Sequence, residues 1–197
     1  MQAIPKAEYE GRIKKFQANI RKAGLDAALV HSNEADFANV RYLTEYWPTF
    51  ESAGVFVPAK GSPVLIIGPE SEAYAQGRSI LKRIAMMVEY RESADPEYPG
   101  IPVAHFSDVA RTAMRGRPLK KLGLVGFSIM PLPVYFGLQR ELPGVELVKA
   151  DEATGMVSVR LQGACRGCPG AAMTLKMGVE RLLKEKVPTV KGVIAVQ

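Results

Sequence analysis

The chain has 197 residues, of which 47% are hydrophobic and 23% charged, a composition typical of globular proteins and not of fibres or disordered tails. Domains usually have roughly 100–150 residues, so the length allows one full domain and a smaller unit, or one large domain. No apolar run approaches the ~20 residues that span a bilayer, and the N-terminus lacks the apolar core of a signal peptide. We therefore expect a cytoplasmic protein without a membrane partner.

The net charge of +6 argues against nucleic-acid binding because of how it is distributed. Residues 1–150 and 151–197 contribute equally, and basic and acidic residues alternate in the tail as on a solvated helix face. No Arg/Lys cluster with interleaved aromatic residues is present. The only histidines, His31 and His105, leave little scope for imidazole-based metal or acid–base sites.

Residues 1–150 predict alternating helices and strands. Tyr9, Ile13, Phe16 and Ile20 have the spacing of an amphipathic helix over 6–23, which Gly24 ends. Further helices are predicted at 36–43, 70–79, 107–115 (with Ser107 as N-cap) and 132–142. Strands are predicted at 25–30, 53–58, 63–67, 84–90, 122–125 and 145–148, the second and third forming a hairpin. This order predicts an α/β fold, a mixed sheet flanked by helices.

The tail, residues 151–197, has a separate predicted order of secondary-structure elements. The alternating segment 156–161 predicts a strand, Cys168-Pro169 opens a helix that runs to about Lys186, and 190–196 predicts a closing strand. We therefore expect two domains, 1–150 and 151–197, the second a small α/β unit of strand, Cys-x-x-Cys helix and strand.

Both cysteines, Cys165 and Cys168, lie in one Cys-x-x-Cys motif, too few for a disulfide framework. A helix N-terminus and the neighbouring Arg166 would lower the pKa of these thiols. Two thiolates fill only half of a four-ligand site for an iron–sulfur cluster or zinc, so a second protomer or an external thiol must supply the rest. Idle buried thiols and thiol–disulfide exchange are the alternatives.

Residues 8–150 resemble the N-terminal domain of the creatinase, prolidase and aminopeptidase P family. The resemblance lies in the opening helix, 24–30, the segment Asn39-Val40-Arg41-Tyr42-Leu43-Thr44, and 142–148. It implies a ribonuclease-H-like domain that helps to form dimers, packs against a catalytic pita-bread domain and caps the substrate cleft of a neighbouring subunit. The metal ligands of that family's peptidases belong to the catalytic domain, so the resemblance implies no catalytic residue in this chain.

Residues 145–196 resemble the C-terminal domain of NifU and its relatives, which carry iron–sulfur clusters. The resemblance runs through 157–169, which includes the Cys-x-x-Cys, then 173–180 and 187–190. It implies that Cys165 and Cys168 bind a cluster shared between two protomers of a homodimer, with an apo-protein as acceptor and zinc as the less favoured metal. Because the usual Asp-Gly-Gly opening is absent, we hypothesise that 132–142 and 145–148 serve both domains.

Our main hypothesis is a non-catalytic fusion of a creatinase-type N-terminal domain with a partial NifU-like segment that carries an iron–sulfur cluster. The alternative is an accessory or dimerisation domain related to Xaa-Pro metallopeptidases, with a vestigial tail and a separate catalytic domain as partner. A peptidase activity of the chain itself is poorly supported, because the dinuclear metal ligands are missing.

Five residues of the first domain have two interpretations each. We expect His31 to be a hydrogen-bonded loop histidine, with a substrate-facing group as the alternative. Arg41 and Tyr42 are expected to pack and pair within the domain or, otherwise, to face the missing catalytic domain. Trp47, like Phe50 after it, is expected to pack in a loop, or to mark a dimer surface if it is exposed.

Overall fold

The computed structural model describes residues 4–49, 51–92, 98–149, 156–160, 180–181 and 192–196. The chain divides into two compact units, Met1–Val148 and Lys149–Gln197. No helix within the described residues is long and apolar enough to cross a membrane. The assignment of separate functions to 1–150 and 151–197 stays a prediction.

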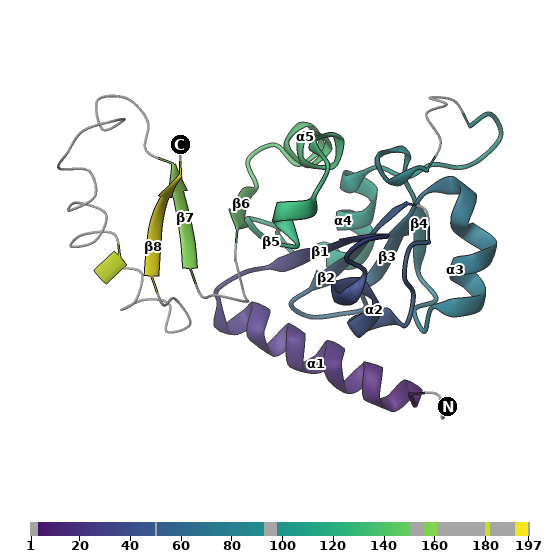
Figure 1. The fold of residues 1–197 in the computed structure, drawn as a ribbon, viewed down its shortest axis with the longest axis horizontal. Coiled ribbons are helices and arrows are strands. Elements are labelled where there is room, and N and C mark those ends of the chain that lie inside the picture. Colours follow the sequence, from purple (N-terminus) through teal and green to yellow (C-terminus); the bar gives the residue numbers. More distant parts are fainter. Residues whose placement is uncertain are drawn as a thin grey trace. The chain divides into compact units, whose positions relative to one another are not determined.

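The first unit is built on a six-stranded mixed sheet with the order β4-β3-β2-β1-β5-β6 (Figure 1). Its strands are β1 (Ala27–Asn33), β2 (Ser52–Pro58), β3 (Val64–Ile67), β4 (Ile84–Met86), β5 (Lys121–Val125) and β6 (Glu146–Lys149). Strand β2 runs antiparallel to β1 and β3, whereas β1 pairs in parallel with β5, and β3 with β4. The predicted hairpin and the predicted α/β fold with a mixed sheet are therefore confirmed.

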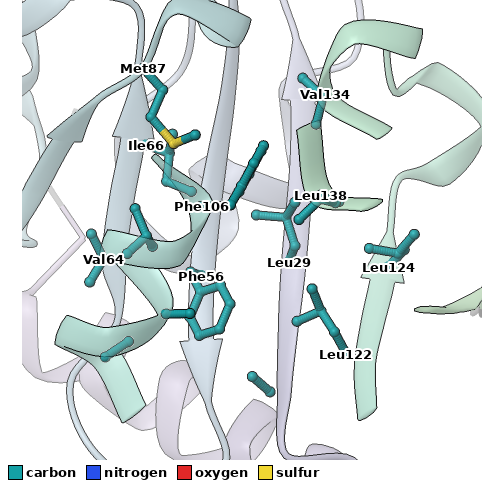
Figure 2. Packing of buried hydrophobic residues seen from close by; sticks show 14 of the residues in the cluster. Leu29, Phe56, Val64, Ile66, Met87, Phe106, Leu122, Leu124, Val134 and Leu138 are labelled. Atoms are coloured by element: carbon teal, nitrogen blue, oxygen red, sulfur yellow. The ribbon is translucent and has the colours of Figure 1, made fainter. Parts of the chain in front are cut away.

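Helices cover both faces of this sheet (Figure 1). On one face lie α1 (Lys6–Lys22), α2 (Ala38–Thr44) and α3 (Glu72–Arg78), and on the other α4 (Phe106–Met114) and α5 (Leu132–Glu141). Side chains alternate along β1, so that Leu29 packs with α4 and α5 whereas Val30 packs with α1 and α2. Figure 2 shows Leu29, Phe56 and Leu138 among the buried side chains on the α4–α5 side of this core.

Most element boundaries differ from the sequence prediction by one or two residues, and three differences have a clear physical reason. Strand β1 extends to Asn33, because pairing with β2 continues through the polar residues that follow the apolar run. The predicted strand 84–90 ends at Met86, and Val88–Tyr90 forms a 3-10 turn that buries Tyr90. Ser107 is not the N-cap of α4: His105 is, and its N–H donates to the Asp108 carboxylate at 3.0 Å.

Helix α5 and strand β6 belong to the first unit. Strand β6 lies at the sheet edge beside β5, where Glu146 N–H donates to the Lys120 carbonyl at 2.8 Å and Lys121 Nζ lies 3.0 Å from Glu146 Oε2. In the second unit, β7 (Met156–Arg160) pairs in parallel with β8 (Gly192–Val196), so both predicted tail strands are confirmed. A strand shared by the two domains has no support in the described residues, since β6 and β7 lie in different sheets.

His31 is the one ionisable side chain of β1, and it is fully buried. It lies inside the strand with no exposed surface, and neither ring nitrogen makes a hydrogen bond among the described residues. Its ring centroid lies 5.7 Å from that of Tyr90, whose buried hydroxyl likewise has no hydrogen-bond partner in the described part of the chain. His31 therefore lies in a strand and not in the expected loop, and its burial gives no support to the alternative of a substrate-facing group.

Tyr90 fits beside His31 only because Gly54, the residue paired with His31 on β2, has no side chain. A Cβ at position 54 would lie 2.6 Å from the Tyr90 hydroxyl oxygen. We expect Gly54→Ala to lower the free energy of unfolding by about 1–3 kcal/mol, the usual cost of overpacking a core. Urea denaturation measures this, with Gly11→Ala in α1 as the control, since nothing lies within 4 Å of that position. Equal stabilities of the two variants would contradict the packing described.

Burial lowers the pKa of His31 to about 4, and the nearby backbone of Ile129 opposes this shift in part. The unfolded chain therefore takes up the proton first, so the contribution of neutral His31 to stability is complete above its ordinary pKa of 6.5 and declines as the pH falls towards 4. We expect acidification across this range to lower the free energy of unfolding of the wild-type protein by about 3 kcal/mol more than that of the His31→Leu variant. Urea denaturation at a series of pH values measures both profiles, and the comparison cancels the carboxylates, which titrate in both proteins. Parallel profiles would contradict the lowered pKa of His31.

Candidate functional site

The predicted cluster ligands, Cys165 and Cys168, lie outside the described residues. The described strands of the second unit flank them in the sequence, because β7 precedes the Cys-x-x-Cys segment and β8 follows it. Parallel strands need a crossover connection, which agrees with a helix between them. Of the predicted helix 168–186, only Glu180 and Arg181 are described, and both are helical. The assignment of the two cysteines stays a prediction.

The first unit offers no competing metal site within the part of the chain that the structure describes. No group of three or more His, Cys, Asp or Glu side chains converges there. His105, the second histidine, caps α4 with an exposed side chain, and its Nδ1 lies 3.6 Å from Glu141 Oε1. Glu141 is in turn bound by Arg140 at 2.9 Å, so this group joins the end of α5 to the start of α4. The His105–Glu141–Arg140 group therefore joins two helices and is not a metal site.

Glu51 is a buried carboxyl that the sequence analysis missed. It is 7% exposed, and its Oε1 accepts a 2.6 Å hydrogen bond from the Tyr46 hydroxyl and another from the Ser71 hydroxyl. Burial raises the pKa of Glu51, and the charges of Glu70 and Glu92 raise it further. No sequence signal identified it, because its partners come from two loops on either side of the hairpin.

Aromatic rings and arginines gather where the connection after α2 meets the end of α3. Arg41 and Arg78 both stack on Trp47, with guanidinium carbons 4.4 and 5.0 Å from the ring centroid, and the Phe37 ring lies 6.2 Å from Trp47. Trp47 is half-buried, which confirms its packing role. Arg41 packs as expected, but the expected pairing is wrong, since it forms no ion pair with any described residue.

Tyr42 lies on the outer side of α2 and is 52% exposed. The Arg12 guanidinium stacks over its ring at 4.5 Å and donates to its backbone carbonyl at 3.2 Å. Tyr42 therefore packs within the unit and joins α1 to α2. Phe50, the other aromatic residue expected in the loop after α2, lies outside the described residues.

Curated relatives of the chain include NifU-like proteins and a protein named for Fe/S biogenesis. A NifU-like protein of Schizosaccharomyces pombe is 41% identical over 73 residues, which are 37% of this chain and 26% of that protein. The Fe/S biogenesis protein NfuA of Teredinibacter turnerae is 49% identical over 39 residues, 20% of each chain. The matched stretch is therefore only a fifth to a quarter of these relatives' length. Residues 137–194 match the family model of the NifU-like domain.

The first unit has a different set of relatives. The N-terminal domain of the cytoplasmic peptidase PepQ from Mycobacterium tuberculosis H37Rv superposes with a TM-score of 0.51 at 23% identity. The superposition covers 71% of this chain and 92% of that domain, and it shows a shared fold. Residues 12–157 match the family model of the Creatinase/Prolidase N-terminal domain. The chain therefore belongs to the Creatinase/Prolidase N-terminal domain family, and its tail carries a NifU-like sequence.

Proposed function

We propose that this chain is a non-catalytic carrier, in which a creatinase-type domain bears a NifU-like segment that holds an iron–sulfur cluster between two protomers. The observation that carries the proposal is the match of 137–194 to the NifU-like domain, because that stretch contains both cysteines of the chain. Thiolates are the usual ligands of iron–sulfur clusters. Cys165 and Cys168 are therefore the residues to which we assign cluster binding.

The number of thiols supports a shared site. Each chain has two cysteines, whereas a [2Fe–2S] or [4Fe–4S] cluster held by protein thiolates alone takes four. A homodimer supplies the four without any further ligand. A cluster held at such an interface can be passed to an apo-protein whose own cysteines replace these ligands one after another, and the biogenesis role in the name of a relative agrees with transfer of this kind.

The proposed absence of catalysis rests on the donor groups of the first unit. A dinuclear peptidase site needs several carboxylate and imidazole ligands that converge on two ions. His31 is fully buried with its ring 5.7 Å from that of Tyr90, and Glu51 shares one oxygen between two hydroxyl donors. Neither group is placed to bind and activate a metal-bound water.

We expect anaerobic reconstitution with iron and sulfide to give the broad visible absorption of an iron–sulfur cluster. Cys165→Ser and Cys168→Ser should each abolish it, because each removes one ligand from both protomers. His105→Gln is the matched control, since it removes an exposed imidazole, a side chain of a metal-ligating type, and leaves both thiols in place. A chromophore that survives in the cysteine variants would contradict the ligand assignment.

A second candidate function is favoured by the extent of the family match, which covers 12–157 and therefore most of the chain. In this alternative the chain is an accessory domain for a separate Xaa-Pro peptidase, and the tail is vestigial. It predicts no chromophore after reconstitution and two thiols that alkylating reagents still reach. Protection of both thiols together with a chromophore would exclude it.

Both candidates exclude peptidase activity of the chain by itself. We expect the purified protein with added manganese to cleave an Xaa-Pro dipeptide no faster than a mock purification. A rate above the mock that rises in proportion to protein concentration would overturn the assignment as non-catalytic, whatever the outcome of the cluster experiment.

A further inference from the structure

Two aromatic rings and two arginines form a site on the α2–α3 side of the first unit. We call it the arginine–tryptophan site, and it consists of Trp47, Phe37, Arg41 and Arg78. Arg41 lies on α2, Arg78 is the last residue of α3, and Trp47 follows α2 in the connection to β2. Arg41 also lies over the Phe37 ring, at 5.6 Å from its centroid. Both arginines are exposed, and both aromatic rings are half-buried, so solvent reaches the site.

The two guanidinium groups have no hydrogen-bond acceptor among the described residues. Arg12, in the same unit, is an arginine whose guanidinium does have a hydrogen-bond acceptor. It stacks on Tyr9 and Tyr42 in the same way, but its Nε also donates to Glu8 at 3.0 Å. In Arg41 and Arg78, stacking occupies a face of each guanidinium and leaves the N–H groups on its edges available to an external acceptor.

The electrostatics of the site favour an anion. Both guanidinium carbons lie within 5.0 Å of one ring centroid, so two positive charges are held near each other. Glu45, four residues after Arg41, makes no ion pair with it. A bound anion would relieve the repulsion, and stacking on Trp47 restricts both side chains in advance, which lowers the entropic cost of binding.

We propose that the arginine–tryptophan site binds an acidic peptide segment of a partner protein, with each guanidinium taking one carboxylate through paired N–H···O bonds. Carboxylates match the guanidinium fork, and two neighbouring acidic residues match two arginines on one ring. Phe37 and Trp47 supply apolar surface for the methylene groups of such side chains. Nucleic acid fits less well, because backbone binding depends on many phosphate contacts and this site offers two cations. The inference does not depend on cluster binding by the tail.

Trp47 is the only tryptophan of the chain, so its fluorescence reports on this site directly. The probe is a short capped peptide with two adjacent glutamates among alanines, and the matched peptide has glutamines instead. We expect a saturable change in Trp47 emission with the glutamate peptide and none with the glutamine peptide. Added sodium chloride should weaken this binding. Substitution of an arginine beside Trp47 also changes its emission directly. Calorimetry with the same peptide therefore measures the affinity of each variant independently of fluorescence.

Arg41→Gln and Arg78→Gln should each weaken binding of the glutamate peptide by about tenfold or more, the effect expected when a charge-assisted hydrogen bond is lost. Arg12→Gln is the matched control, because it removes the same charge from an arginine already bound to Glu8. Circular dichroism verifies that each variant is folded.

Three outcomes would overturn the proposal. The first is equal binding of the glutamine peptide, or no saturable binding of either peptide. The second is an equal loss of affinity in Arg12→Gln, which would mean that net charge and not this site attracts the peptide. The third is tighter binding of a short single-stranded oligonucleotide with the same dependence on Arg41 and Arg78, which would assign the site to phosphates.

Discussion

Strand β1 is the constraint on which the first unit depends. It is hydrogen-bonded to β2 on one side and β5 on the other, and residues 27–32 are buried beneath helices on both faces. The Asp26 carboxylate accepts the N–H groups of Lys120 and Lys121 at 2.8 and 2.9 Å, which joins the start of β1 to the start of β5. At the other end, buried Ser32 Oγ accepts the N–H of Val40 at 3.1 Å and fixes where α2 begins.

The position of α2 in turn determines the chemistry of the surface. With α2 anchored to β1 and α3 packed on the same face, Arg41 and Arg78 reach one indole ring from two helices. The first unit therefore presents two cationic groups at its surface, whereas no group of three or more metal-ligating side chains converges among the described residues. In our account the metal chemistry belongs to the tail, where two thiolates per chain make a second protomer part of the site.

The sequence predicted most of the sheet because strands covered on both faces appear as continuous apolar runs, such as 27–30 and 64–67. It failed where the signal lies in tertiary contacts. His31 looked like a loop residue because it follows the apolar run, yet pairing with Gly54 keeps it in the strand. The Arg41–Trp47–Arg78 contact was not predictable either, since the β2–β3 hairpin separates α2 from α3 in the sequence and the contact exists only in the folded unit. The cluster ligands rest on the Cys-x-x-Cys pattern and its flanking sequence.

Native mass spectrometry of the full chain after anaerobic reconstitution tests the central claim most directly, because it weighs protein and cluster together. We expect one dominant species with the mass of two chains and one iron–sulfur cluster, and apo-monomer when the cluster is removed by a chelator. A single chain that carries a whole cluster would contradict the shared site. Two chains that never acquire a cluster would contradict the carrier function and leave the accessory domain as the explanation.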